Sequence, residues 1–228
     1  EQARSMGIRP EKIFRASGMI LNSRFYEPAA WDRAAERVRL GLDPGRTTAI
    51  VLFGGQGSGV IEKIARKLDS SGLGLQLILI CGRNAKLTAR LRAARWRIPV
   101  HIEGFTKEVP RFMQLADFLI GKPGPGSVSE ALAMKLPVIV ESNAWTLPQE
   151  RYNAVWIRET GVGEVVRNFR HIDAVVREFL EPERLERRRA NAARIENRAV
   201  FEIPEFLARV MGDPPAPDQA AGNSISST

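Results

Sequence analysis

The feature that most constrains this chain is a repeated alternation of apolar runs with amphipathic stretches between residues 46 and 200. Thr47–Phe53 and Leu75–Cys81 are largely apolar runs of strand length, and each is followed by glycine. Between them, four apolar residues recur at helical spacing: Ile61, Ile64, Ala65 and Leu68. Strands that alternate with helices are typical of a parallel sheet, because each helix provides the crossover to the next strand.

The same alternation continues toward the carboxyl end of the chain. Further strands are expected at Val100–Ile102, Asp117–Ile120, Pro137–Val140 and Gly163–Val166, with helices near 85–94, 109–116, 128–134 and 149–160 and two more on either side of Pro182. Crossovers of this kind are almost always right-handed. We therefore predict an α/β fold, a Rossmann-like doubly wound parallel sheet of about six strands, with ligands at the carboxyl ends of the strands.

Composition divides the chain into three zones. Residues 1–45 are Arg-rich with irregularly spaced aromatic residues, which predicts a connecting segment from a missing or partial amino-terminal domain. Residues 46–211 form the predicted Rossmann-like domain. Residues 212–228 are rich in Pro, Gly, Ser and Ala and are predicted to be a disordered tail, because they cannot bury enough apolar surface to offset chain entropy.

Charge and cysteine content narrow the class of protein. The 228 residues include 34 Lys plus Arg against 26 Asp plus Glu, a formal charge of +8, without the interleaved aromatics of a nucleic-acid surface. No nucleic-acid partner is expected. The Arg-rich stretch 184–198 indicates a solvated helix face or a surface that faces an anionic membrane. The single Cys81 excludes an internal disulfide, which favours a cytoplasmic location.

The first glycine loop, Gly54–Gly59, follows a strand and opens a helix. Unpaired backbone N–H groups and the helix dipole favour an anion there, and phosphate is the natural ligand. The loop matches neither G-x-G-x-x-G nor a P-loop, so a tight turn with Ser58 as the helix N-cap is an equally simple interpretation.

The second glycine loop, Gly121–Gly126, contains two Gly-Pro steps and leads into Ser127-Val128-Ser129-Glu130. That sequence has the form of a capping box, in which Glu130 binds the Ser127 backbone N–H. Alternatively, the N–H groups from Gly126 onward bind a diphosphate and the Glu130 carboxylate binds a ribose diol.

Polar side chains gather at a third helix start, in Pro148–Asn153. Gln, Glu and Asn supply the donors and acceptors that sugar hydroxyls need, although a polar helix start would have the same composition. The two histidines, His101 and His171, lack metal-ligand spacing, so we expect no metal and no cofactor.

The runs Gly121–Leu132, Leu136–Ile139 and Pro148–Asn153 together resemble the donor-binding half of glycosyltransferase family 28, in particular its monogalactosyldiacylglycerol synthase-like members. The resemblance extends over residues 10–210 and includes Phe14–Ile20, Arg24–Pro28, Phe53–Gly59, Ile80–Asn84, Ile98–Val100 and Glu103–Phe105. One departure is the loop Asn143–Pro148, which stands where plant-like members have a shorter loop with glycine before the Gln-Glu pair; it leaves the donor sugar open.

The resemblance implies a GT-B fold, in which a carboxy-terminal Rossmann-like domain binds a UDP-sugar and an amino-terminal domain binds the lipid acceptor. This chain would be the carboxy-terminal half, and the general base would lie in the other half, so no catalytic residue is named. The resemblance places the base near Gly104 and Phe105, the diphosphate over Gly126–Val128, the ribose at Glu130, and the sugar hydroxyls near Gln149 and Glu150. The donor-binding residues that it implies are Gly55, Gly57, Ser58, Gly82, Arg83, Asn84, Gly104, Phe105, Thr106, Gly124, Gly126, Ser127, Val128, Glu130, Gln149, Glu150 and Asn153.

The function so implied is transfer of a hexose from a UDP-sugar to a lipid, diacylglycerol above all, by an enzyme peripheral on the inner face of the cell membrane and inactive without its amino-terminal half. Two alternatives stay open: a nucleotide-sugar-binding subunit that needs a separate acceptor-binding chain, and transfer of N-acetylglucosamine to a polyprenyl-linked acceptor.

Overall fold

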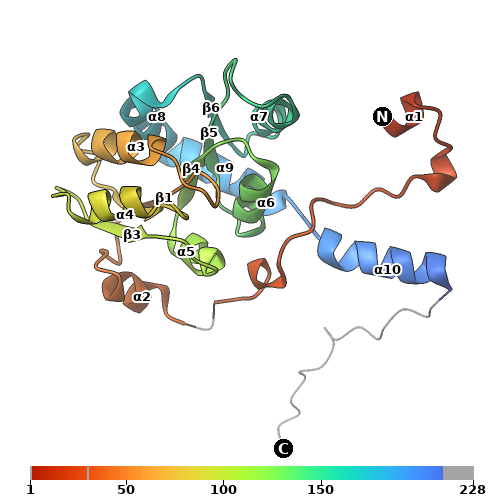
Figure 1. The fold of residues 1–228 in the computed structure, drawn as a ribbon, viewed down its shortest axis with the longest axis horizontal. Coiled ribbons are helices and arrows are strands. Elements are labelled where there is room, and N and C mark those ends of the chain that lie inside the picture. Colours follow the sequence, from red (N-terminus) through yellow and green to blue (C-terminus); the bar gives the residue numbers. More distant parts are fainter. Residues whose placement is uncertain (1, 30, 213–228) are drawn as a thin grey trace, which may run out of the picture. The chain divides into compact units, whose positions relative to one another are not determined.

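The computed structural model describes residues 2–29 and 31–212, and its centre is one six-stranded sheet (Figure 1). All strand pairs are parallel, in the order β3-β2-β1-β4-β5-β6. The strands are β1 (Thr48–Leu52), β2 (Gln76–Ile80), β3 (Val100–Glu103), β4 (Phe118–Gly121), β5 (Val138–Glu141) and β6 (Gly163–Val166). The predicted doubly wound sheet is confirmed, and every predicted strand lies within one residue of its observed bounds.

Helices cover both faces of this sheet, as the apolar runs require. They are α2 (Arg33–Arg39), α3 (Val60–Asp69), α4 (Ala85–Arg92), α5 (Val109–Leu115), α6 (Pro125–Ala133), α7 (Pro148–Thr160), α8 (Ile172–Phe179) and α9 (Pro182–Arg194). All five residues of β1 and of β2 are buried, which is why these strands are apolar throughout instead of alternating with polar residues.

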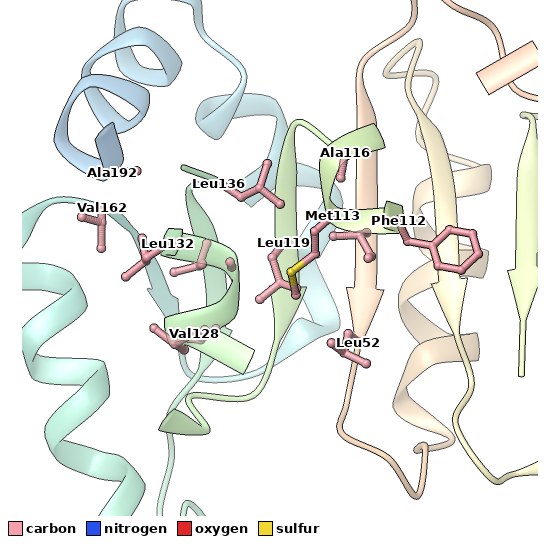
Figure 2. Packing of buried hydrophobic residues seen from close by; sticks show 14 of the residues in the cluster. Leu52, Phe112, Met113, Ala116, Leu119, Val128, Leu132, Leu136, Val162 and Ala192 are labelled. Carbon is pink, nitrogen blue, oxygen red and sulfur yellow. The ribbon is translucent and has the colours of Figure 1, made fainter. Parts of the chain in front are cut away.

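Successive strand residues point to opposite faces and so divide the core in two. Ile50 and Leu52 pack on the face covered by α5, α6, α7 and α9 (Figure 2). Ala49 and Val51 pack on the other face, with apolar residues of α3, α4 and α8. Helices on both faces leave the two edges of the sheet, where strands begin and end, to the connecting loops.

Three apolar residues between positions 21 and 45 pack in the core, in a stretch that was predicted to be a connecting segment. Leu21, Phe25 and Leu42 are each at most 6% exposed and pack in the cluster that contains α5 and α6. Contacts accordingly group Leu21–Glu196 in one compact unit. These apolar residues are too irregularly spaced to show a helix or strand period, so the sequence pattern does not reveal their burial.

The second compact unit joins residues up to Ile20 with those from Asn197. It contains α1 (Gln2–Ser5) and α10 (Ala199–Met211), a third helix beyond the two expected around Pro182. The rings of Phe14 and Phe206 stack with centroids 4.1 Å apart, and Glu202 accepts the Ser17 N–H at 2.7 Å. Gly212 ends α10 in the left-handed conformation, and the rest of the predicted tail lies outside the described residues.

The carboxylate of Asp117, directly before β4, links three other elements. It accepts the Thr48 N–H of β1 at 2.8 Å and pairs with guanidinium groups of α2 and α9: Arg33 at 3.0 Å, Arg37 at 2.9 Å and Arg189 at 3.4 Å. Burial raises the pKa of this carboxyl, but the Thr48 N–H and the arginines outweigh burial and hold it below its usual value.

Part of the Arg-rich stretch predicted to be a solvated helix face is therefore structural. Besides Arg189, Arg188 of α9 is only 8% exposed, pairs with Glu164 at 2.8 Å and lies 4.6 Å over the Phe179 ring. The other arginines of this helix, Arg184, Arg187 and Arg194, are exposed.

We expect Asp117→Asn to lower the free energy of unfolding by about 3 kcal/mol at neutral pH, because it leaves the buried Arg37 guanidinium without its anion. Since the folded pKa is depressed, this contribution is complete above the unfolded pKa of about 4 and disappears as pH falls through the lower folded pKa. Urea unfolding at a series of pH values measures both effects. Glu186→Gln, an exposed change on α9, is the control; equal stability of both variants would contradict the role of Asp117.

Candidate functional site

The residues implied for donor binding all lie at one edge of the sheet, because they follow the carboxyl ends of parallel strands. Gly55, Gly57 and Ser58 follow β1; Gly82, Arg83 and Asn84 follow β2; Gly104, Phe105 and Thr106 follow β3; Gly124, Gly126, Ser127, Val128 and Glu130 follow β4; Gln149, Glu150 and Asn153 follow β5. The strand order reverses between β1 and β4. In open α/β sheets the crevice at such a reversal is where ligands bind.

The loops after β1 and β2 pack backbone against backbone. A Cβ atom on Gly57 would overlap the Cys81 carbonyl oxygen, and one on Gly82 would overlap the Gly55 carbonyl oxygen. Both glycines have positive φ, 69° and 57°. The Arg83 N–H donates to the Gly55 carbonyl at 2.9 Å and closes the contact. Glycine is thus required here for close approach, whether or not a ligand is present.

Several implied residues also have a local structural task. The Asn84 side chain caps α4 by accepting the Leu87 N–H at 3.0 Å, and Ser58 Oγ accepts the Val60 N–H at 3.3 Å. Thr106 Oγ accepts the Glu108 N–H at 2.9 Å. Such bonds hold the loop ends in place, and they use oxygen atoms that a ligand would otherwise meet.

The loop after β3 presents an aromatic face. Phe105 is 52% exposed, and the Arg83 guanidinium lies 4.2 Å over its ring. A planar cation on an exposed ring next to the β2 loop makes a platform for a flat ligand group. The sequence analysis named both residues but not their contact.

The helix after β4 begins earlier than the predicted capping box implied. Gly124 is the N-cap, Pro125 is the first helical residue, and no side chain caps this end. Proline suits that position because its φ is already helical and it lacks an N–H. Ser127 therefore lies inside the helix, and the capping-box interpretation of Ser127 and Glu130 is wrong.

Two backbone donors are left at the start of α6. The Val128 N–H already donates to the Gly124 carbonyl at 3.1 Å, whereas the N–H groups of Gly126 and Ser127 have no helical acceptor before them. With the helix dipole they form a positively polarised end that faces the crevice between β1 and β4.

Lys122 adds a full positive charge to this end of α6. Its Nζ lies 3.1 Å from Oε1 of Glu150, whose side chain is 10% exposed. A Cβ atom on Gly54 would lie 3.9 Å from the Lys122 Cε, so the lysine reaches toward the first glycine loop. The Asn153 amide donates to the Pro123 carbonyl at 2.8 Å, and two side chains of α7 thereby hold the loop before α6.

Sequence reasoning missed this ion pair. The residue patterns gave Lys122 no partner, and the family resemblance placed Glu150 near the sugar hydroxyls. The only available signals were a lysine directly after a strand and a glutamate at a helix start. The two residues are 28 positions apart, and neither helix nor strand periodicity indicates a contact over that separation. Gln149, in contrast, is exposed, as a sugar-binding amide would have to be.

Glu130 lies one turn beyond Ser127, half-buried, and burial raises the pKa of its carboxyl. Within the described chain its side chain forms no hydrogen bond or ion pair. A half-buried carboxylate without a protein partner, close to two free N–H donors, is available to a ligand hydroxyl.

A hollow of about 890 Å³ extends along α3 from Ser58 and Gly59. Most of the charged residues that line it are cationic. They are Lys63, Arg66, Lys67 and Arg90, and the acidic residue is Glu62. Glu62 pairs with Arg90 at 2.7 Å and Arg66 at 3.7 Å, so the hollow keeps a positive excess beside the first glycine loop.

The described residues include neither a metal-binding cluster nor a membrane-spanning helix. No group of three or more His, Cys, Asp or Glu side chains within residues 2–29 and 31–212 is placed to hold a metal ion. Among the helices of this part of the chain, none combines the length and apolar content needed to cross a bilayer.

A doubly wound sheet with glycine loops and a positively polarised helix end at one edge defines a Rossmann-like domain. Residues 49–203 match the model of the glycosyltransferase family 28 C-terminal domain, and the chain belongs to that family. The family resemblance found in the sequence is thereby confirmed.

The similar curated proteins are plant enzymes. The chain is 32% identical over 213 residues to monogalactosyldiacylglycerol synthase 1 of Arabidopsis thaliana, which covers 89% of this chain and 39% of that protein. It is 31% identical to probable monogalactosyldiacylglycerol synthase 2 of Oryza sativa subsp. japonica, over 91% of this chain and 46% of the relative. The chain thus spans less than half the length of these relatives.

Solved structures share the fold at lower identity. Acinetobacter baumannii MurG superposes with a TM-score of 0.64 at 14% identity, over 87% of this chain and 58% of MurG. Staphylococcus aureus MnaA, solved with UDP, superposes with a TM-score of 0.64 at 17% identity, over 92% of this chain and 59% of MnaA. WaaG, a glycosyltransferase of lipopolysaccharide biosynthesis, superposes with a TM-score of 0.61 at 20% identity, over 91% of this chain and 58% of WaaG. The fold is that of the GT-B glycosyltransferases.

Gly57→Ala should lower the free energy of unfolding by about 2 kcal/mol or more, since it combines a positive φ with overlap onto the Cys81 carbonyl. Gly55→Ala is the matched control: a Cβ atom there meets nothing within 4 Å, and its φ is not positive. Denaturant unfolding of both variants checks this. If Gly57→Ala were as stable as Gly55→Ala, close packing of the two loops would be refuted.

Proposed function

We propose that this chain is the donor-binding part of a glycosyltransferase that moves a hexose from a UDP-sugar to a lipid, with diacylglycerol as acceptor. The observation that carries the proposal is the position of the Lys122 side chain beside the uncapped amino end of α6, where a Cβ atom on the N-cap Gly124 would lie 3.3 Å from its Cε. Together they offer an anion a full charge and two N–H donors at the crevice between β1 and β4. The names of the curated relatives support galactose as the sugar and diacylglycerol as the acceptor.

The proposed donor spans the carboxyl edge of the sheet. The diphosphate binds the N–H groups of Gly126 and Ser127 and the Lys122 ammonium, and Glu130 accepts from the ribose hydroxyls. The uracil stacks at the loop after β3, where Phe105 is exposed. Gln149, exposed at the start of α7, faces the sugar hydroxyls. Glu150 acts on the donor through Lys122, to which it is bonded.

The chemistry follows from charge development at the diphosphate. An acceptor hydroxyl attacks the anomeric carbon, the bond from that carbon to the diphosphate oxygen breaks, and UDP leaves with an added negative charge. The helix end and Lys122 stabilise that charge without reorganisation, because both are already in position. The acceptor proton passes to a base that we place in the acceptor-binding half, either in the same protein or in a partner chain.

The positive excess of the chain supports a peripheral location on an anionic membrane, in the cytoplasm, where the lipid acceptor is available. The cationic hollow along α3 lies beside the first glycine loop, which faces the acceptor in this proposal.

Calorimetric titration of the chain with UDP and with uridine tests the role of Lys122. Lys122→Ala should weaken UDP binding about tenfold or more and leave uridine unaffected, since a hydrogen bond to a charged group contributes about 1.5–3 kcal/mol and uridine has no diphosphate. Lys67→Ala, in the last turn of α3 away from this edge, is the control and should change neither affinity.

An equal loss for both ligands, or a folded chain that binds no UDP, would contradict the proposed site. Titration with UDP-galactose, UDP-glucose and UDP-N-acetylglucosamine then separates the donors. Preference for a UDP-hexose supports the proposal, and preference for UDP-N-acetylglucosamine supports transfer of N-acetylglucosamine instead.

A further inference from the structure

Exposed apolar side chains of the larger unit are concentrated in one short segment. Among its described residues six large apolar side chains are exposed, and four of the six lie between positions 145 and 155: Val38, Phe105, Trp145, Leu147, Tyr152 and Val155. Trp145 is 93% exposed and Tyr152 70%. Burial of an aromatic side chain is strongly favourable, so a nearly bare tryptophan indicates a surface that something else covers.

The backbone around Trp145 is held in place by side chains. Asn143 accepts the Trp145 N–H at 2.9 Å, and its own amide donates to the Arg167 carbonyl at 3.1 Å. The Arg151 guanidinium donates to the carbonyls of Ala144 and Thr146, each at 3.1 Å. The tip of this loop, which leads into α7 (Figure 1), is therefore presented outward by bonds on both of its sides.

The surface charge of this segment is positive. Between residues 142 and 152 the acidic side chain is Glu150, which is 7% exposed and paired with Lys122. Arg151 is exposed within the segment, and Arg167 is exposed beside it. Farther along α7, Arg158 and the acidic Glu159 are both exposed.

Indole, phenol, aliphatic and guanidinium groups on one surface are the combination that suits the boundary between lipid headgroups and acyl chains. We propose that residues 143–155, here called the Trp145 surface, contact an anionic bilayer: Trp145 and Leu147 enter the boundary region, and Arg151 and Arg167 meet anionic headgroups. The proposal rests on the proposed function in one respect, that the acceptor is a lipid.

The Trp145 surface lies next to the proposed donor site, so a contact with a bilayer there would bring the lipid acceptor close to the donor. Pro148–Thr160 is α7, whose first turn carries Glu150, the partner of Lys122. A bilayer at the Trp145 surface therefore lies beside the proposed sugar end of the donor site.

Sedimentation with vesicles of phosphatidylcholine, with and without phosphatidylglycerol, tests the proposal. Trp145→Ala should weaken binding to the anionic vesicles about tenfold, the loss expected for one aromatic side chain withdrawn from water. Val38→Ala, at a 59% exposed site on α2, is the matched control and should bind as the unaltered chain does. Because both sites are exposed, both variants should fold.

Fluorescence locates the contact. The emission of Trp145, obtained as the difference between the unaltered chain and Trp145→Phe, should shift to the blue and be quenched by brominated lipid in anionic vesicles. Unchanged vesicle binding of Trp145→Ala would overturn the proposal, as would quenching by UDP-galactose instead of brominated lipid, or a dimer of the chain that Trp145→Ala abolishes.

The UDP titration keeps this result apart from the proposed function. Vesicle binding that depends on Trp145 in a chain that binds no UDP would uphold the membrane surface and refute the donor site. If the chain binds UDP and its binding to vesicles does not change in Trp145→Ala, the donor site is upheld and the membrane surface is refuted.

Discussion

The contact between the backbones of the loops after β1 and β2 is the constraint on which the site depends. Gly57 lies against the Cys81 carbonyl and Gly82 against the Gly55 carbonyl, at distances that exclude any side chain. Gly121 is similarly close to the Leu52 carbonyl where β4 ends beside β1. These loops therefore lie close together where β1, β2 and β4 end, and the Lys122 side chain lies beside Gly54 and Gly124.

The second half of the site is held by charge instead of close packing. Glu150 and Asn153 of α7 bind Lys122 and Pro123, so the loop before α6 is fixed from the neighbouring helix. In this pair the Lys122 side chain is still 45% exposed. A diphosphate can therefore bind the ammonium group while the group stays bonded to Glu150. The uncapped start of α6 adds donors that no side chain of this helix uses. The ammonium and the N–H donors are thus already in position before a ligand arrives, which is the condition for preorganised stabilisation of a leaving diphosphate.

Most of the fold could be predicted because it depends on local patterns. The strands were readable as short, largely apolar runs, several of them followed by glycine, and the doubly wound arrangement follows from right-handed crossovers. The start of α6 was misplaced because Ser127 and Glu130 imitate a capping box, whereas Pro125 at the first helical position determines the boundary. The burial of Leu21, Phe25 and Leu42 depends on contacts with distant helices, and their spacing shows no period.

The site was predictable as a set of loops and not as a set of contacts. Parallel topology alone brings the loops to one edge, so the implied residues could be gathered there from the strand pattern. The Lys122–Glu150 pair and the stacking of Arg83 on Phe105 depend on side-chain directions across different crossovers. The outward placement of Trp145 depends likewise on two hydrogen bonds that a sequence does not display: Asn143 accepts the Trp145 N–H, and Arg151 donates to the Ala144 carbonyl.

The central claim is that a nucleoside diphosphate binds at the crevice between β1 and β4. The most direct test is to map the backbone amide resonances of the isotopically labelled chain by NMR during titration with UDP. The account predicts saturable shifts of the Gly126 and Ser127 amides, together with those of the loops after β1 and β4. Saturable shifts confined to the hollow along α3 or to the smaller unit would contradict it, as would a folded chain whose amides at the start of α6 do not respond.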